Sequence, residues 1–169
     1  MITLSMQAQS TVMVGGEAMY PKKDIVSNAV ESADHTTLVA AVKAAGLVST
    51  LQGEGTFTVF APVNDAFENL PAGTAESLLK PEAKGKLTAV LTYHVIAGTY
   101  DFDALAKAIK KCNGMASLKT VQGEELTFMM NGKHNIQVKD AKGNVANISV
   151  YDVYQSNGVI QVIDKVLLP

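Results

Sequence analysis

The sequence contains no arginine and no tryptophan. All 14 of its basic side chains are therefore lysines, and the formal net charge is only -2. Arginine is the residue that reads guanine edges and phosphate groups through paired hydrogen bonds, so its absence argues against sequence-specific nucleic-acid binding. A charge this small also gives no strong long-range attraction to a polyanion. We expect no nucleic-acid partner.

Cysteine and long apolar runs are also scarce. A single cysteine, Cys112, excludes an internal disulfide, and no run approaches the roughly 18 apolar residues that a membrane-spanning helix needs. Residues 1–16 carry no charge and so lack the basic start of a signal peptide. We expect residues 1–20 to be a flexible arm, or a remnant of processing or cloning, in which Thr11–Val14 could pair as a strand.

The side-chain patterns that mark common enzymes are missing as well. The three histidines, His35, His94 and His134, lie far apart and lack the i, i+4 spacing of a helical metal site. The sequence has no Gly-x-Ser-x-Gly elbow, no phosphate-binding glycine loop and no dinucleotide fingerprint. We predict a protein that is not an enzyme and that uses no metal or cofactor.

What the sequence does contain is enough apolar material for one packed domain. Hydrophobic residues make up 47% of the 169 residues and charged residues 18%, which is typical of a globular chain. A length of 169 residues suits a single domain, and we place it at residues 21–169. Ile25, Val26, Ala29 and Val30 recur at helical spacing.

The stretch from Thr56 to Phe67 has the clearest local pattern. Phe57, Val59 and Ala61 alternate with Thr56, Thr58 and Phe60, and this period of two predicts a strand. Pro62 has no N–H to donate and should end it. We expect the side chain of Asn64 or Asp65 to cap the helical turn that follows, and Phe67 to fold that turn back onto the strand.

The two halves of the chain have different periodicities. Helical spacing dominates up to about residue 111, and Asp101 or Asp103 should begin the last helix. Beyond Met115, short alternating runs are separated by Gln122-Gly123, Asn131-Gly132, Lys142-Gly143 and Asn157-Gly158. Turns at intervals of about ten residues indicate an antiparallel meander. The predicted class is α+β, with helices first and strands second.

Three segments, in order along the chain, resemble the signature segments of the fasciclin domain family. They are Thr56–Phe67, Leu91–Gly98 with its tyrosine–histidine pair, and Ser156–Pro169. The matching residues are Thr56, Phe60, Pro62, Asn64, Asp65, Phe67, Tyr93, His94, Asn157, Gly158 and Asp164. The resemblance covers about residues 24–169 and implies a helical lobe packed on an antiparallel β-wedge or sandwich, with the last strand returning to its middle.

The resemblance also implies a function. Fasciclin domains of extracellular proteins are implicated in cell adhesion through the tyrosine–histidine segment, which Tyr93 and His94 match. A family aspartate–isoleucine pair linked to integrin recognition corresponds to Asp152-Val153, where the tyrosines on either side indicate a bulge or an edge position. From the residues alone, His94 is interpreted as a core histidine that donates to a backbone carbonyl, and this interpretation is compatible with the adhesive one. Gln161 stands where the family often has histidine, and an amide cannot titrate.

Together these features predict a secreted or periplasmic adhesion or protein-interaction module. Its partner would be a cell-surface protein or polysaccharide, and we expect a monomer. The low charge and the lack of disulfides favour a bacterial source. The alternative is a domain that binds a small ligand or carbohydrate in a cleft between the helical lobe and the β-wedge.

Overall fold

The computed structural model describes residues 11–53 and 55–169. Its helical segments are α1 (Ile25–Ala29), η1 (Ala33–His35), α2 (Thr36–Ala45), α3 (Val48–Leu51), α4 (Asn64–Glu68), α5 (Thr74–Leu78), η2 (Pro81–Ala83), α6 (Lys84–Tyr93) and α7 (Phe102–Lys111). Its strands are β1 (Val12–Val14), β2 (Glu17–Met19), β3 (Phe57–Pro62), β4 (Val95–Ala97), β5 (Met115–Lys119), β6 (Glu125–Asn131), β7 (Asn135–Lys139), β8 (Val145–Gln155) and β9 (Gly158–Ile163). None of these helices is long and apolar enough to cross a bilayer.

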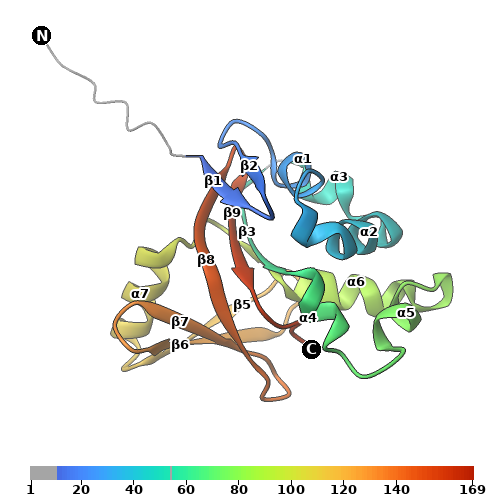
Figure 1. The fold of residues 1–169 in the computed structure, drawn as a ribbon. Helices are drawn as coiled ribbons and strands as arrows, with labels where there is room; N and C mark the ends of the chain where they lie inside the picture. The colour runs from blue at the N-terminus through green and yellow to red at the C-terminus, as the bar shows by residue number, and fades with distance from the viewer. Residues whose placement is uncertain (1–10, 54) are drawn as a thin grey trace, which may run out of the picture.

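Seven strands form one sheet in the order β4-β3-β9-β8-β7-β6-β5. Strands β5 to β9 make the expected antiparallel meander, and their turns fall at the predicted glycines. Strand β9 then lies between β8 and β3 and runs parallel to β3, with Phe57 opposite Gly158 and Pro62 opposite Ile163 (Figure 1). The final strand therefore joins the two halves of the chain at the centre of the sheet, as the family resemblance implied.

Successive side chains of β3 point to opposite faces of the sheet and enter two different hydrophobic cores. Val59 and Ala61 belong to a core shared with helices α1, α2 and α6, whereas Phe60 belongs to a second core shared with α7 and the meander. Phe60 packs on Phe128 with the ring centroids 5.2 Å apart. Figure 1 shows the same division, with α1 to α6 on one side of β3 and β9 and with α7 and β5 to β7 on the other. The predicted α+β class is confirmed.

Part of the predicted N-terminal arm is a hairpin in the structure. Strands β1 and β2 pair antiparallel, with Val12 opposite Met19, and the side chains of Val14 and Met19 are buried in the first core. The Tyr20 N–H donates to the side chain of Asn28 at 3.0 Å, which ties the end of the hairpin to α1. The pairing considered for Thr11–Val14 is therefore present from Val12 onward. The remainder of the predicted arm, residues 1–10, lies outside the described residues.

Candidate functional site

Asn64, a residue of the first family segment, caps a helix other than the expected one. Helix α4 begins after Val63, and no side chain caps it. The Oδ1 atom of Asn64 instead accepts hydrogen bonds from the Thr37 N–H at 3.0 Å and the Thr36 hydroxyl at 3.2 Å, in the first turn of α2. Its Nδ2 donates to the Ala33 carbonyl at 2.8 Å. The prediction of a local cap by Asn64 or Asp65 was wrong, because the free N–H groups that Asn64 satisfies belong to a different element.

Asn157, in the last family segment, has a parallel role. Its Oδ1 accepts from the Ile25 N–H at 3.0 Å, at the start of α1, and its Nδ2 donates to the Leu51 carbonyl, at the end of α3. Next to it, Gly158 lies so close to β3 that a Cβ atom would sit 1.9 Å from the Phe57 carbonyl oxygen. The Asn-Gly pair therefore joins two helices to the β3–β9 junction.

Tyr93 is fully buried, with 0% of its surface exposed. Its hydroxyl donates to the Glu125 carbonyl at 3.0 Å and accepts from the Ala141 N–H at 2.9 Å. These bonds connect α6 to the start of β6 and to the β7–β8 turn. In this conformation a partner cannot touch the Tyr93 side chain.

His94 is also buried, with 2% of its surface exposed. Its Nδ1–H donates to the Val90 carbonyl at 2.7 Å, and its Nε2 accepts from the Leu167 N–H at 3.0 Å. Burial lowers the pKa of His94 to about 4, although the Val90 carbonyl and Asp140 oppose that shift. The neutral ring thus joins the end of α6 to the C-terminal segment, which matches the core-histidine reading.

Asp152 lies in the predicted bulge of β8, where pairing with β9 shifts register between Val150 and Val153. It has a left-handed backbone with φ of 55°. Its carboxylate accepts from the Phe102 N–H at 2.7 Å and from Gln161 Nε2 at 3.0 Å, while Gln161 Oε1 accepts from the Asp152 N–H at 3.0 Å. Val153 is completely buried. Of the predicted pair, only Asp152 reaches the surface.

The remaining matched residues are mostly structural. Asp164 accepts from the backbone and side-chain N–H groups of Asn147 at 2.8 and 2.9 Å, which fixes the start of β8 against the end of β9. Phe60, Pro62 and Phe67 are buried, whereas Thr56 and Asp65 are exposed. The structure therefore spreads these positions along both ends of β3 and β9 and does not gather them into one site.

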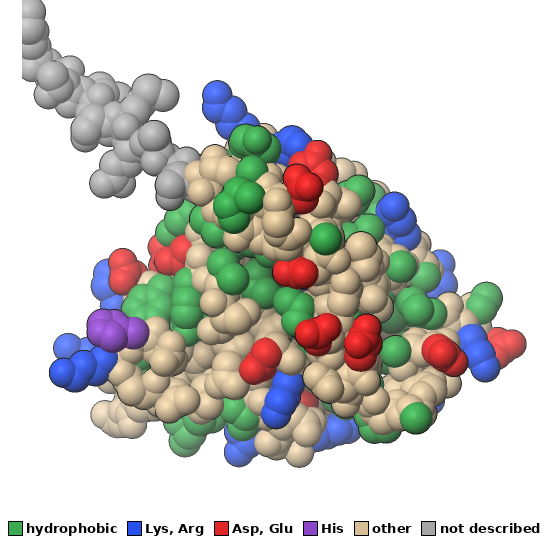
Figure 2. Space-filling model, viewed as in Figure 1, with side chains coloured by type: hydrophobic (Ala, Val, Ile, Leu, Met, Phe, Trp, Pro, Cys, Tyr) green, Lys and Arg blue, Asp and Glu red, His purple; other side chains and the backbone are tan. Residues whose placement is uncertain are grey.

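A partly exposed group of aromatic and acidic side chains surrounds Asp152, and sequence reasoning missed it. Phe102 and Tyr151 pack edge to face with centroids 5.2 Å apart, and the Tyr154 hydroxyl donates to Asp101 at 3.1 Å. Partial burial, the bond to Asp101 and neighbouring carboxylates raise the pKa of Tyr154 to about 12. We call Asp101, Phe102, Tyr151, Asp152 and Tyr154 the Asp152 cluster. Figure 2 shows hydrophobic side chains at the surface beside α7, on the left of the view, with acidic side chains near them.

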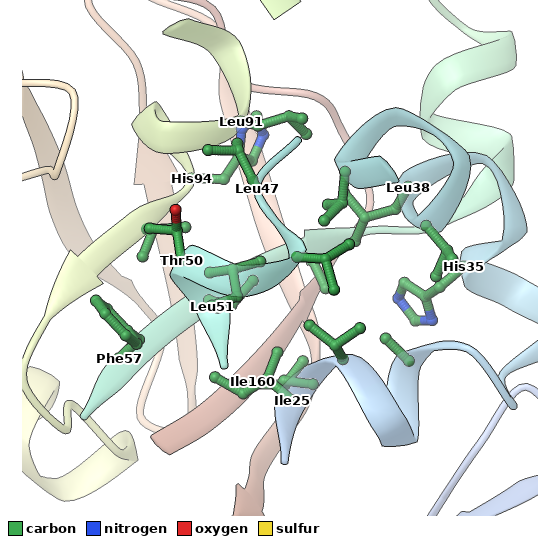
Figure 3. Close-up of a pocket in the computed structure, with 18 of the residues that line it drawn as sticks. Ile25, His35, Leu38, Leu47, Thr50, Leu51, Phe57, Leu91, His94 and Ile160 are labelled. Atoms are coloured by element: carbon green, nitrogen blue, oxygen red, sulfur yellow. The ribbon is translucent and has the colours of Figure 1, made fainter. Parts of the chain in front are cut away.

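A second feature is an apolar cavity of about 60 Å³ between the helical lobe and the sheet. Helices α1, α2 and α3 contribute Ile25, Leu38 and Leu51 to its wall, and the sheet contributes Phe57 and Ile160. His94 and His35 lie at opposite sides of it (Figure 3). Exposed residues also line it, namely Lys43, Thr50 and Val121, so the cavity reaches the surface. The alternative prediction was a cleft between these two parts of the fold, but no local pattern identified its lining, because its walls come from separate helices and strands.

One side-chain pair has the chemistry of a nucleophile and a base. The Ser32 hydroxyl lies 2.9 Å from His35 Nδ1, but both side chains are buried, so no substrate can reach the hydroxyl. His35 Nε2 makes no hydrogen bond of normal geometry to another described residue, although the Ala61 carbonyl is close enough to favour the protonated ring. Burial outweighs that effect and lowers the pKa of His35. Within residues 11–53 and 55–169, no three His, Cys, Asp or Glu side chains are placed to hold a metal ion.

The fold and the three segments define a fasciclin domain, and comparison with known families shows the same. The family model described as the fasciclin domain matches residues 33–169. The chain belongs to the fasciclin domain family.

Individual relatives come from bacteria and animals. Protein sll1483 of Synechocystis sp. is 47% identical over 163 residues, which are 95% of this chain and 82% of that protein. The cell surface glycolipoprotein MPB83 of Mycobacterium bovis is 38% identical over 73% of this chain and 48% of its own length. The transforming growth factor-beta-induced protein ig-h3 of Sus scrofa is 36% identical over 79% of this chain, which corresponds to 17% of that longer protein.

A solved structure supports the architecture. The fasciclin domain pair of the insect cell adhesion molecule Fasciclin I superposes with a TM-score of 0.77 over 87% of this chain and 51% of that one. The sequences are 17% identical there, so the likeness concerns the fold.

Proposed function

We propose that this fasciclin domain is a non-catalytic adhesion or protein-interaction module that acts outside the cytoplasm, in the periplasm or after secretion. Its partner would be a cell-surface protein or polysaccharide, and the domain would act as a monomer of bacterial origin. Membership of the family supports the adhesion role, and the name of the related MPB83 protein places that relative at a cell surface.

The Asp152 cluster is the observation that carries this proposal. Tyr93, His94 and Val153 are buried and can support a binding surface only from beneath. Asp152, in contrast, holds the bulge of β8 against the N-terminus of α7, where partly exposed aromatic side chains meet carboxylates. Tyrosine is enriched in interface hot spots because it combines a large apolar ring with a hydroxyl group. We place the contact surface at the Asp152 cluster.

Adhesion of cells from the source organism to the immobilised protein tests this role. The wild type is compared with Tyr154→Ala and with the matched control Tyr20→Ala, in which an exposed tyrosine near the N-terminal hairpin is removed. We expect the wild type and the Tyr20 variant to bind cells and a folded Tyr154 variant to lose binding. Equal adhesion of all three would place the surface elsewhere, and failure of the wild type to bind would refute the adhesion role.

The apolar cavity favours a second candidate function, the binding of a small ligand between the helical lobe and the sheet. Its aliphatic walls would leave the hydroxyl groups of a carbohydrate without hydrogen-bond partners, and burying such groups is unfavourable. The cavity therefore supports an apolar ligand and not a carbohydrate. Saturable shifts of the cavity methyl groups on addition of an apolar compound would support this second function.

A further inference from the structure

The cavity wall is mostly aliphatic. Val26, Leu38, Val42, Leu47 and Val59 line it together with the residues named above. A water-sized group needs about 10–15 Å³ of cavity, so 60 Å³ accommodates about four to six such groups. That is the size of the end of a short aliphatic chain.

The polar residues in the wall are largely satisfied by the protein itself. Both ring nitrogens of His94 are hydrogen-bonded, and the Thr92 hydroxyl donates to the Thr88 carbonyl at 2.7 Å. His35 Nδ1 is paired with Ser32, and its buried Nε2, which makes no hydrogen bond of normal geometry to another described residue, is the exception. A charged ligand group placed inside the cavity would therefore lose its water and meet at most this one ring nitrogen. Only the uncharged part of a ligand fits there.

The mouth of the cavity has a different character. Lys43 lines it and is exposed, and among the described residues its ammonium group has no carboxylate partner, since the ion pair found there joins Lys23 and Glu31. This cation at the rim favours an anionic group at the surface.

We propose that the cavity binds the hydrocarbon end of a single-chain aliphatic carboxylate, with its carboxylate outside the cavity at Lys43. This inference rests on the second candidate function and adds the class of ligand. The chain contributes binding free energy by removing apolar surface from water, and Lys43 selects the anionic head. Since the head stays exposed, its contribution is that of a surface ion pair.

Octanoate and octanol are the probes, because they share the chain and differ in the head group. Binding is measured by calorimetry and by NMR shifts of the methyl groups of Leu38, Leu51 and Ile160. We expect both probes to bind saturably and octanoate to bind about two- to fivefold more tightly, as a surface ion pair allows. That preference should shrink at high salt.

Two pairs of variants locate the two halves of the ligand. Lys43→Gln should weaken octanoate to the level of octanol, whereas Lys107→Gln, a control on the exposed side of α7, should change neither. Ala29→Phe should fill the cavity and abolish both, whereas Ala44→Phe, on the exposed side of α2 and outside the cavity lining, should abolish neither. The Lys43 test remains decisive even if Ala29→Phe fails to fold.

The outcomes distinguish the assignment of a carboxylate head from the binding of an apolar ligand. If octanol and octanoate bind equally and Lys43→Gln has no effect, the carboxylate assignment is wrong and the apolar site stands. If neither probe shifts the cavity methyl groups, both the ligand class and the second candidate function are refuted.

Discussion

The Nε2 atom of His94 accepts a hydrogen bond from the Leu167 N–H at 3.0 Å, across 73 positions of sequence. The Leu168 N–H, next along the chain, donates to Asp140 at 2.9 Å. Leu167 itself is fully buried in the second core. The C-terminal segment is thus anchored by a neutral imidazole whose other nitrogen is used within its own helix.

Acid should weaken the fold through His94. Its pKa is about 4 in the folded protein and about 6.5 when unfolded, so between these values the unfolded chain binds a proton that the folded one does not. The contribution of His94 to the free energy of unfolding is fully present above about pH 6.5. It falls by on the order of 3 kcal/mol as the pH drops towards 4. His35, whose pKa is also lowered by burial, adds in the same direction. Urea unfolding at a series of pH values measures the effect.

His94→Gln is the matching variant, because an amide keeps hydrogen-bonding atoms but cannot take up a proton in this range. We expect it to be less stable at pH 7 by about 1–3 kcal/mol and to show a flatter pH dependence from 6.5 to 4. His134→Gln, at an exposed histidine, is the control and should retain the wild-type slope. An unchanged slope in His94→Gln would show that acid acts through other groups.

Asn157→Ala should destabilise the protein by about 1–3 kcal/mol, because it leaves the Ile25 N–H and the Leu51 carbonyl without partners. Asn157→Asp tests the bond to Leu51 separately. Its carboxylate can still accept from the Ile25 N–H, but its second oxygen is also an acceptor and faces the Leu51 carbonyl. We expect chemical denaturation to show a loss for both, and Asn69→Ala, at an exposed asparagine, to stay within about 0.5 kcal/mol of wild type. A neutral Asn157→Ala would mean that water replaces both bonds.

Two glycines should respond in opposite ways to alanine. In Gly158→Ala the new Cβ would collide with the Phe57 carbonyl, so β9 cannot keep its place beside β3. We expect a loss of at least about 4 kcal/mol, or failure to fold. Gly85, in α6, has open space around it, and Gly85→Ala should stabilise by up to about 1 kcal/mol. Thermal melting of both variants is the test, and a stable Gly158→Ala would contradict the close packing of these strands.

Asp152 distinguishes a structural loss from a loss of contact. Asp152→Ala removes the acceptor for the Phe102 N–H and places alanine at a positive φ, which should cost about 2–3 kcal/mol. Asp152→Asn keeps an acceptor oxygen and tolerates that backbone, so we expect a cost of about 1 kcal/mol or less. If cells adhere through the charge of Asp152, the asparagine variant should fold well and still bind them poorly. Normal adhesion of that variant would leave Asp152 a purely structural role.

Local patterns predicted the elements that depend on neighbouring residues. The alternation of Phe57 to Ala61 identified β3 and its two faces, and Asp101 caps α7 through the Ala104 N–H as expected. The side chain that caps α2 could not be predicted in this way, because it is Asn64, 27 positions from Thr37. The same holds for the cavity and the Asp152 cluster, which exist only where separate elements meet. For His94, the sequence left the buried and the adhesive readings open, and the ring's burial removes it from direct contact.

The position of β9 delays the folding of the chain during its synthesis. Phe57 pairs with Gly158, so β3 is synthesised 101 positions before the strand that completes it. At about 5–20 residues per second, roughly 5 to 20 s separate the two. Throughout that interval one edge of β3 is unpaired and neither core can close, since β9 contributes to both. The nascent chain therefore cannot complete either core until β9 has been synthesised. Non-local pairing of this kind makes folding slow and leaves the chain exposed to aggregation.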